Sequence, residues 1–318
     1  MCNFATTKTK NENYNMITGR FAPSPTGRMH LGNVFSALLS WLSAKSKDGR
    51  WLLRIEDIDP QRSHMEYAKL LMDDLQWLGL TWDGEPVFQS QRSDNYEHYY
   101  NILQQQGLTY PCYCTRADLL VTQAPHESDG RVVYPGTCRP KKVEGERWSV
   151  EEKGPAATRL IVADENISFA DGHYAIQSVN MAQQVGDYII RRKDGAWAYQ
   201  LAVVVDDGLM GINEVVRGRD LLLSSPQQIS LSRILGFTPP QFIHLPLLIN
   251  EAGQRLSKRD KSLDIGVLRQ HYTAQEIIGQ LAFYAGLLPD SQPIMPSQLL
   301  KAFSWEKVPH DDITVIAG

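Results

Sequence analysis

The sequence lacks long apolar segments and has little cysteine. None of its 318 residues belongs to an uninterrupted apolar run of the ~18 residues that a membrane-spanning helix needs. The first sixteen residues are polar and do not resemble a secretory signal. Four cysteines, three of them clustered, do not form the disulfide framework of a secreted protein. We therefore expect a cytoplasmic protein without a membrane span, in which residues 1–15 form a flexible tail.

The chain also lacks an excess of positive charge. Its net charge is −4, so the composition gives no general indication of a nucleic-acid partner. Two short basic segments, 139–142 and 191–193, could form local cationic patches or could be ordinary solvated surface. Apolar residues make up 42 % of the chain, and its length suffices for one large domain with an insertion.

The segment from residue 17 to residue 44 is the most informative part of the chain. Residues 17–22 are predicted to form a strand, and an apolar helix is predicted to begin at Leu31. A loop rich in Pro and Gly joins them. Unpaired backbone N–H groups and the helix dipole favour an anion at such a junction, so we predict a phosphate site beside His30 and Gly32.

Strand and helix patterns alternate after this junction. Residues 51–56 indicate a buried strand, and Ser63 with Glu66 fits a capping box for a helix that ends near Leu78. This alternation predicts an α/β fold, a doubly wound Rossmann-like parallel sheet. Further elements are predicted at 91–106 (helix), 158–169 (hairpin), 201–205 (strand ending at Asp206 and Asp207), 215–218 (strand), 224–235 (helix), 242–249 (strand), and 275–286 and 296–302 (helices).

The pattern divides the chain into four parts after the tail. Residues 16–110 and 186–262 are predicted to be the two halves of the Rossmann-like α/β domain. Residues 111–185, which begin in a segment rich in Cys, Gly and Pro, are predicted to be an insertion. Residues 263–318 are predicted to be a helical appendix.

The insertion contains a candidate metal site. Cys112, Cys114 and Cys138 have the spacing of a zinc site that lacks one ligand, and His126 is a chemically ordinary candidate for the fourth position. Zinc would stabilise a polar segment that has little core of its own. The alternative is three inert thiols.

Two sequence motifs, taken together, identify a family. Met29-His30-Leu31-Gly32 resembles the HIGH motif of class I aminoacyl-tRNA synthetases, and the segment 255–259 (RLSKR) resembles their KMSKS loop. The preceding segment 20–27 (RFAPSPTG) resembles the glutamyl branch. Met29 is a volume-conserving change. Arg255 and Arg259 replace a lysine and a serine of the second motif, whereas Lys258 is retained.

The resemblance implies a reaction between ATP and an amino acid. The substrate carboxylate attacks the α-phosphate of ATP and pyrophosphate leaves, so positioning and charge neutralisation matter more than a general base. His30 and Lys258 would be catalytic, with Mg²⁺ bound to ATP. The residues implied to bind ATP are His30, Gly32, Asn33, Arg255, Leu256, Ser257, Lys258 and Arg259.

The glutamyl branch further implies a pocket for glutamate. This substrate needs cations for two carboxylates and an anion for its ammonium group. The implied residues are Arg20, Phe21, Ala22, Pro23, Ser24, Glu56, Tyr199 and Arg217. A structural ion pair between Arg20 and Glu56 is the alternative for those two. The family also has a tyrosine zinc ligand, which would be Tyr134 here.

Only about sixty residues follow Lys258, so we expect no separate anticodon-binding domain. This pattern resembles the glutamyl-queuosine tRNA(Asp) synthetases. The resemblance implies that L-glutamate is activated with ATP and transferred to queuosine in the anticodon of tRNA(Asp). The alternatives are a glutamyl-tRNA synthetase with a minimal C-terminal region and a non-catalytic tRNA-binding paralogue. We expect a monomer.

Overall fold

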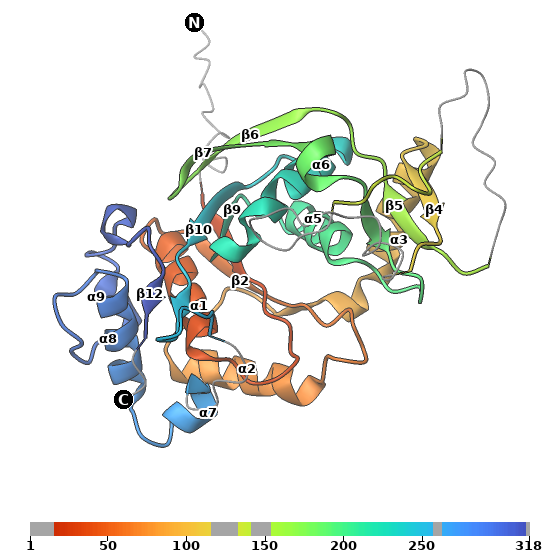
Figure 1. The fold of residues 1–318 in the computed structure, drawn as a ribbon. Coiled ribbons are helices and arrows are strands. Elements are labelled where there is room, and N and C mark those ends of the chain that lie inside the picture. The colour runs from red at the N-terminus through yellow and green to blue at the C-terminus, as the bar shows by residue number, and fades with distance from the viewer. Residues whose placement is uncertain (1–15, 116–132, 141–153, 257–262, 316–318) are drawn as a thin grey trace, which may run out of the picture.

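The computed structural model describes residues 16–115, 133–140, 154–256 and 263–315 (Figure 1). Its α-helices are α1 Leu31–Lys45, α2 Met65–Trp77, α3 Ser93–Gln105, α5 Tyr199–Leu209, α6 Ser225–Ile234, α7 Ile265–Leu268, α8 Ala274–Tyr284 and α9 Pro296–Leu299. Shorter helical turns lie at Gln89–Gln91, Met181–Val185, Arg219–Ser224 and Trp305–Lys307. None of the helices in the described part of the chain is long and apolar enough to cross a membrane.

A parallel sheet forms the centre of the molecule. Strands β1 (Thr18–Phe21), β2 (Arg50–Ile55) and β3 (Val87–Phe88) pair in the order β1-β2-β3, and β9 (Glu214–Gly218) pairs with β10 (Gln241–Leu245). The backbone N–H of Asn213 donates to the carbonyl of Thr18, which places β9 beside β1. The resulting order β3-β2-β1-β9-β10 confirms the predicted doubly wound α/β fold.

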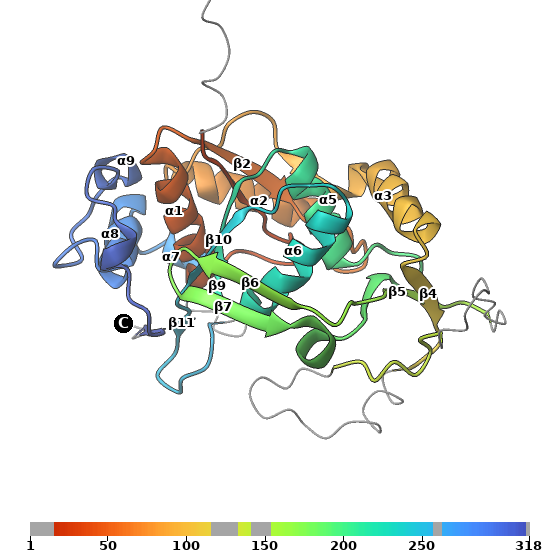
Figure 2. The ribbon, with the colours of Figure 1, turned by 90° about the horizontal axis from the view of Figure 1, so that it is seen from above.

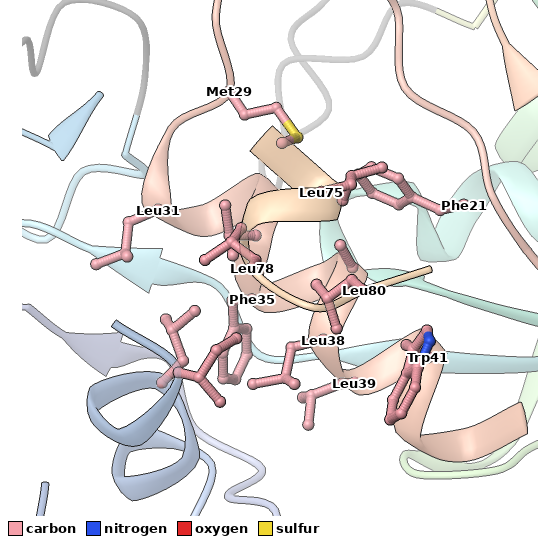
Figure 3. Packing of buried hydrophobic residues seen from close by; sticks show 14 of the residues in the cluster. Phe21, Met29, Leu31, Phe35, Leu38, Leu39, Trp41, Leu75, Leu78 and Leu80 are labelled. Carbon is pink, nitrogen blue, oxygen red and sulfur yellow. The ribbon is translucent and has the colours of Figure 1, made fainter. Parts of the chain in front are cut away.

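Both faces of this sheet are covered. Val215 and Phe242 point into a core shared with α3, α5 and α6, whereas their neighbours Val216 and Ile243 point into a core shared with α1, α2 and α8. This alternation is expected for strands with two buried faces. Figure 3 shows the second core, where side chains of α1 such as Phe35 and Leu38 lie beside side chains of α2 and the segment after it.

A separate antiparallel region follows α3. Strands β4 (Thr109–Cys112), β5 (Ala157–Leu160) and β8 (Tyr188–Arg191) form one sheet, and β6 (Asn166–Asp171) and β7 (Ala175–Asn180) form a hairpin. Figures 1 and 2 show this hairpin reaching back across the molecule to the end of the central sheet. There the backbone N–H of Gly172 donates to the carbonyl of Phe242 in β10. The antiparallel region therefore contacts the domain core, although the predicted boundary 111–185 stays a prediction.

The C-terminal part returns to the catalytic domain. Thr273 and Glu276 form a capping box at the start of α8. Strand β12 (Ile313–Thr314) pairs in parallel with β11 (Leu248–Ile249), so the prediction of an entirely helical C-terminal part was wrong. The predicted strand 242–249 is likewise two strands, β10 and β11, which are separated at Pro246, where the chain lacks a backbone donor.

The predicted strand 201–205 was also wrong, because these residues lie in helix α5. Its five consecutive apolar residues are buried on all sides, and three of them are valines, which are typical of strands. Periodicity cannot distinguish a fully buried helix from a buried strand. Asp206 and Asp207 therefore lie inside a helix and not at the end of a strand.

Two local predictions in loops were wrong as well. The capping box at Ser63 does not form: α2 begins at Met65 after His64, because the backbone N–H of Ser63 is held by the carbonyl of Asp59 in the preceding turn. The predicted hairpin 158–169 belongs to two sheets, since β5 pairs with β4 and β8 while β6 pairs with β7.

Candidate active site

A cavity of about 490 Å³ lies at the carboxyl ends of β1, β2 and β9. This is the edge at which ligands bind in open α/β sheets. The cavity brings together thirteen of the residues predicted from sequence: Arg20, Phe21, Ala22, Pro23, Ser24, His30, Gly32, Asn33, Glu56, Tyr199, Arg217, Arg255 and Leu256. Ser257, Lys258 and Arg259 lie outside the described residues, so their positions stay a prediction.

His30 is the N-cap of α1 and also lines the cavity. Its Nδ1 accepts a hydrogen bond from the backbone N–H of Gly32 at 3.2 Å, and Asn33 Oδ1 accepts from the N–H of His30 at 3.1 Å. This reciprocal cap fixes the orientation of the imidazole. Because Nδ1 accepts, the proton of the neutral ring is on Nε2. The helix N-terminus thus faces the cavity with its dipole and its first N–H groups.

A buried ion network supports the carboxylate side of the cavity. Arg54 is fully buried, and its guanidinium donates to Asp207 Oδ1 at 2.6 Å and to Glu56 Oε1 at 3.3 Å. Arg20 lies beside the same Asp207 oxygen, with an Nε–Oδ1 distance of 3.5 Å. Arg20 and Glu56 therefore each have another partner, and the alternative of a simple pair between them is replaced by this network.

The network shifts the acidity of its carboxyl groups in opposite directions. Burial raises the pKa of Glu56, and the neighbouring Arg54 and Arg20 charges oppose this shift without cancelling it. Burial would also raise the pKa of Asp207, but Arg54 and Arg20 outweigh it and lower that pKa. Asp207 therefore stays anionic to lower pH than an ordinary aspartate, and a cation bound beside Glu56 would favour the ionised form of Glu56.

Arg217 and Tyr199 add a second cation and a hydroxyl group to the cavity. Arg217, in β9, is 5 % exposed and lines the cavity together with Tyr199, the first residue of α5. Burial raises the pKa of Tyr199, so its hydroxyl stays protonated and can donate. Burial lowers the pKa of Arg217, and Arg20 adds to this effect despite the opposing influence of Tyr199. An anion bound between these two arginines would relieve their repulsion.

The start of the second motif, Arg255 and Leu256, is held by contacts with the rest of the domain. Leu256 is buried, and its N–H donates to the carbonyl of Leu248 in β11. Arg255 forms an ion pair with Asp220, which also lines the cavity. The described part of the second motif therefore lies at the same cavity as the first.

The three clustered cysteines lie together in the antiparallel region. Their sulfur atoms are all within 4.8 Å of one another, and the Cys114–Cys138 separation is 3.6 Å. Two thiolates on one tetrahedral zinc ion, with Zn–S bonds of about 2.3 Å, lie about 3.8 Å apart. The cluster therefore has the donor chemistry and the dimensions of a metal site.

The phenol oxygen of Tyr134 is a candidate fourth metal ligand at this cluster. Its oxygen lies 3.5 Å from the sulfur of Cys112 and 3.8 Å from that of Cys114, and it accepts from the N–H of Cys138 at 2.7 Å. Burial raises the pKa of Tyr134, and the hydrogen bond with Cys112 adds to this, so a phenolate there needs a cation beside it. His126, the other candidate, lies outside the described residues.

Several buried polar residues around the cavity are absent from the sequence-based prediction. These residues are Arg54, Asp171 and His244. Arg54 contacts Glu56 and the distant Asp207, His244 contacts Arg217 from 27 positions away, and Asp171 contacts His244 from 73 positions away. Asp207 was noted, but as a strand end. The one available signal was a charged residue within an apolar strand, as at Arg54, because a buried charge requires a partner. The basic segment 191–193 is partly neutralised, since Arg191 pairs with Glu97 and Arg192 pairs with Asp59 and Asp194.

The fold and the cavity define the catalytic domain of a class I tRNA synthetase. The family model for the catalytic domain of class I tRNA synthetases (E and Q) matches residues 16–287. A crystal structure of a glutamate tRNA ligase from Elizabethkingia meningosepticum in complex with its amino acid has a TM-score of 0.80 and 28 % sequence identity. The alignment covers 95 % of this chain and 68 % of that chain.

Two curated relatives are more similar in sequence. The Glutamyl-Q tRNA(Asp) synthetase of Nitratidesulfovibrio vulgaris is 44 % identical over 304 residues, which are 92 % of this chain and 94 % of the relative. That of Symbiobacterium thermophilum is 42 % identical over 314 residues, 95 % of this chain and 97 % of the relative. The chain belongs to the glutamyl-Q tRNA(Asp) synthetase family, a ligase family of class I tRNA synthetases.

Proposed function

We propose that the protein activates L-glutamate with ATP and transfers the glutamyl group to queuosine in tRNA(Asp). The observation that carries the proposal is the single cavity in which a helix N-terminus, two arginines and a buried glutamate converge. Glutamate has the complementary charges: two carboxylates for Arg20 and Arg217, and an ammonium group for Glu56. The names of the curated relatives support the choice of glutamate and of tRNA(Asp).

In the first step, the α-carboxylate of glutamate attacks the α-phosphate of ATP. The P–O bond to pyrophosphate breaks, and a mixed anhydride of glutamate and AMP forms. His30, through its proton on Nε2, and the N-terminus of α1 would stabilise the phosphate oxygens, with Mg²⁺ bound to ATP. Gly32, Asn33, Arg255, Leu256, Ser257, Lys258 and Arg259 complete the proposed ATP site.

In the second step, a hydroxyl of the queuosine cyclopentenediol attacks the carbonyl of the anhydride. The C–O bond to AMP breaks, the hydroxyl passes its proton to a phosphate oxygen of the departing AMP, and an ester forms. AMP carries the departing charge, so the cations that hold the phosphate also assist its departure. Phe21, Ala22, Pro23, Ser24 and Tyr199 would hold the amino acid in place during both steps.

The proposal includes one structural zinc ion, bound by Cys112, Cys114, Cys138 and Tyr134. When bound, zinc would cross-link the end of β4 to the segment 133–140. Arg159 supports this site, because its Nε donates to the sulfur of Cys112 at 3.2 Å and its guanidinium lies 3.6 Å from the centre of the Tyr134 ring. This cation would offset the negative charge of the ligand set.

The proposed function is tested with labelled glutamate, ATP and two forms of tRNA(Asp), with and without queuosine. We expect label only on the queuosine form, and we expect the attached glutamate to protect the cyclopentenediol from periodate. Label on the 3′ adenosine of tRNA(Glu) would instead identify a glutamyl-tRNA synthetase. Absence of ATP–pyrophosphate exchange with glutamate would support a non-catalytic paralogue.

A further inference from the structure

Arg217 is fixed by side chains that lie behind the cavity. Its Nη1 donates to Gln228 Oε1 and its Nη2 to Ser225 Oγ, both at 2.8 Å. Its Nε lies 3.3 Å from His244 Nε2, and its guanidinium lies over the ring of Phe242 at 4.9 Å. An arginine side chain has several rotatable bonds, so contacts on its far side determine which N–H groups face the cavity.

His244 accepts the Nε–H of Arg217 because its other nitrogen is occupied. Its Nδ1 lies 2.5 Å from Asp171 Oδ2, and both side chains are fully buried. The carboxylate can only accept, so the imidazole proton is on Nδ1, and the lone pair of Nε2 faces Arg217 Nε and the Oγ of Ser225, which lies 3.2 Å away. Burial lowers the pKa of His244, and the Arg217 charge adds to this, so the hydrogen bond that Nδ1–H donates to Asp171 does not make the ring cationic.

Asp171 is itself held rigidly at the tip of the hairpin β6–β7. Its Oδ1 accepts from the backbone N–H groups of His173 and Tyr174, both at 2.9 Å. The adjacent Gly172 packs directly on β10, where a Cβ atom would lie 2.6 Å from a side-chain carbon of Ile243. The close approach brings Asp171, which is 73 residues away in sequence, to His244.

We propose that Asp171 and His244 are positioning residues for glutamate binding, which orient Arg217 toward the substrate carboxylate. The chain of contacts runs from the hairpin tip through the imidazole to the guanidinium that lines the cavity. The inference rests on the proposed function in one respect, the role of Arg217 as a carboxylate ligand. It adds a contribution of the antiparallel region to amino-acid recognition.

The substitution Asp171→Asn tests this proposal with a nearly isosteric change. The new amide would donate to His244 Nδ1, so the ring proton would move to Nε2. Nε2 could then no longer accept the Nε–H of Arg217. In ATP–pyrophosphate exchange, we expect KM for glutamate to rise about tenfold to a hundredfold, the effect of an unsatisfied buried donor. KM for ATP and kcat at saturating glutamate should change less than about threefold. A purely structural role would lower kcat through loss of active protein and leave KM for glutamate unchanged.

Asp164→Asn is the matched control, because Asp164 is an exposed residue just before β6 that bonds only Asn180 among the contacts described for it. It should leave both KM values unchanged. A second pair of variants tests the same contact in case Asp171→Asn does not fold. His244→Gln can keep an acceptor near the position of Nε2, whereas His244→Asn cannot, so glutamate KM should rise much more in His244→Asn.

The results separate the inference from the function on which it rests. A glutamate KM within about twofold of wild type in either Asp171→Asn or His244→Asn, with normal wild-type exchange, would overturn the inference alone. A wild-type protein that shows no exchange with glutamate would overturn the proposed function and the inference with it.

Discussion

Arg54 donates to Asp207 across the interior, with 2.6 Å between Nη1 and Oδ1; the Arg54 side chain is fully buried and the Asp207 side chain is 7 % exposed. The two residues are 153 positions apart, one in β2 and the other in α5. The same Asp207 oxygen lies 3.5 Å from Arg20, and Arg54 also holds Glu56. The buried Asp207 carboxylate therefore holds the cationic Arg20 directly and the acidic Glu56 through Arg54.

Replacing this carboxylate should destabilise the fold. Asp207→Asn would leave Arg54 and Arg20 without their shared anion, and breaking a buried ion pair typically costs about 3–5 kcal/mol. We expect the free energy of unfolding, measured by urea denaturation at pH 7, to fall by that amount. Asp194→Asn is the control, because the pair of Asp194 with Arg192 is exposed and worth less than about 1 kcal/mol. Equal stability of the two variants would show that the network does not support the fold.

Sequence reasoning succeeds where the residues of a feature are close in the chain. Around His30, the strand, the loop and the start of the helix follow one another, so the sequence predicts their junction and the cavity beside it. The parallel sheet follows from alternating strand and helix patterns. The cysteine cluster, with two of its members close in sequence, was likewise predicted from spacing, and the structure brings the three sulfurs together.

Sequence reasoning fails where tertiary packing determines the local structure or the contact. Residues 201–205 of helix α5 contain no polar position, so this apolar run was assigned to a strand. The contact of Asp171 with His244 depends on a hairpin that crosses to β10, and no local pattern specifies such a crossing. The register of β12 beside β11 joins residues 65 positions apart. These relationships are tertiary, which is why propensity and periodicity do not predict them.

Glutamate binding should weaken at mildly acidic pH. The pKa of Glu56 is raised above its ordinary value of 4.5 by burial, so this group becomes protonated as pH falls toward that raised pKa. The ammonium group of glutamate requires the ionised form. Affinity is therefore full above the raised pKa and is lost as pH falls through it, with binding coupled to proton release.

The measurement is isothermal titration calorimetry with glutamate between pH 5.5 and pH 8, in buffers of different ionisation enthalpy. Above pH 5.5 the side chain of free glutamate, with a pKa of about 4.3, stays almost fully ionised. The variant Glu56→Gln should bind weakly and without pH dependence in this range. Equal affinity of the wild type and of Glu56→Gln for glutamate at pH 8 would contradict the role assigned to Glu56.

Lys258 should be essential for activation of glutamate. In the proposed reaction its ammonium group neutralises phosphate charge in the transition state, and removal of such a group typically costs about a hundredfold to a thousandfold in rate. We expect Lys258→Ala to lower the rate of ATP–pyrophosphate exchange by at least that factor while the unfolding temperature stays the same. Lys261→Ala, in the same segment but outside the motif, is the matched control and should retain exchange. Exchange by Lys258→Ala at the wild-type rate would refute this role.

The fourth metal ligand can be identified by comparing two substitutions. We expect about one zinc ion per chain by metal analysis, and we expect Cys138→Ser to lose it. Loss of a residue that contacts only the metal ligands typically weakens metal binding by about tenfold to a hundredfold. If Tyr134 is itself a ligand, Tyr134→Phe should weaken zinc binding by more than this. Arg159→Met should fall within that smaller range, since Arg159 contacts the ligands only.

Affinity is measured at pH 7 by competition with a chromophoric chelator, with Cys2→Ser as the control because Cys2 lies in the predicted tail. His126→Ala should bind zinc as the wild type does. A loss of zinc in His126→Ala together with normal binding by Tyr134→Phe would transfer the fourth position to His126. A wild-type protein without metal would leave three thiols and a tyrosine that associate by packing and hydrogen bonds alone, and the zinc proposal would then be wrong.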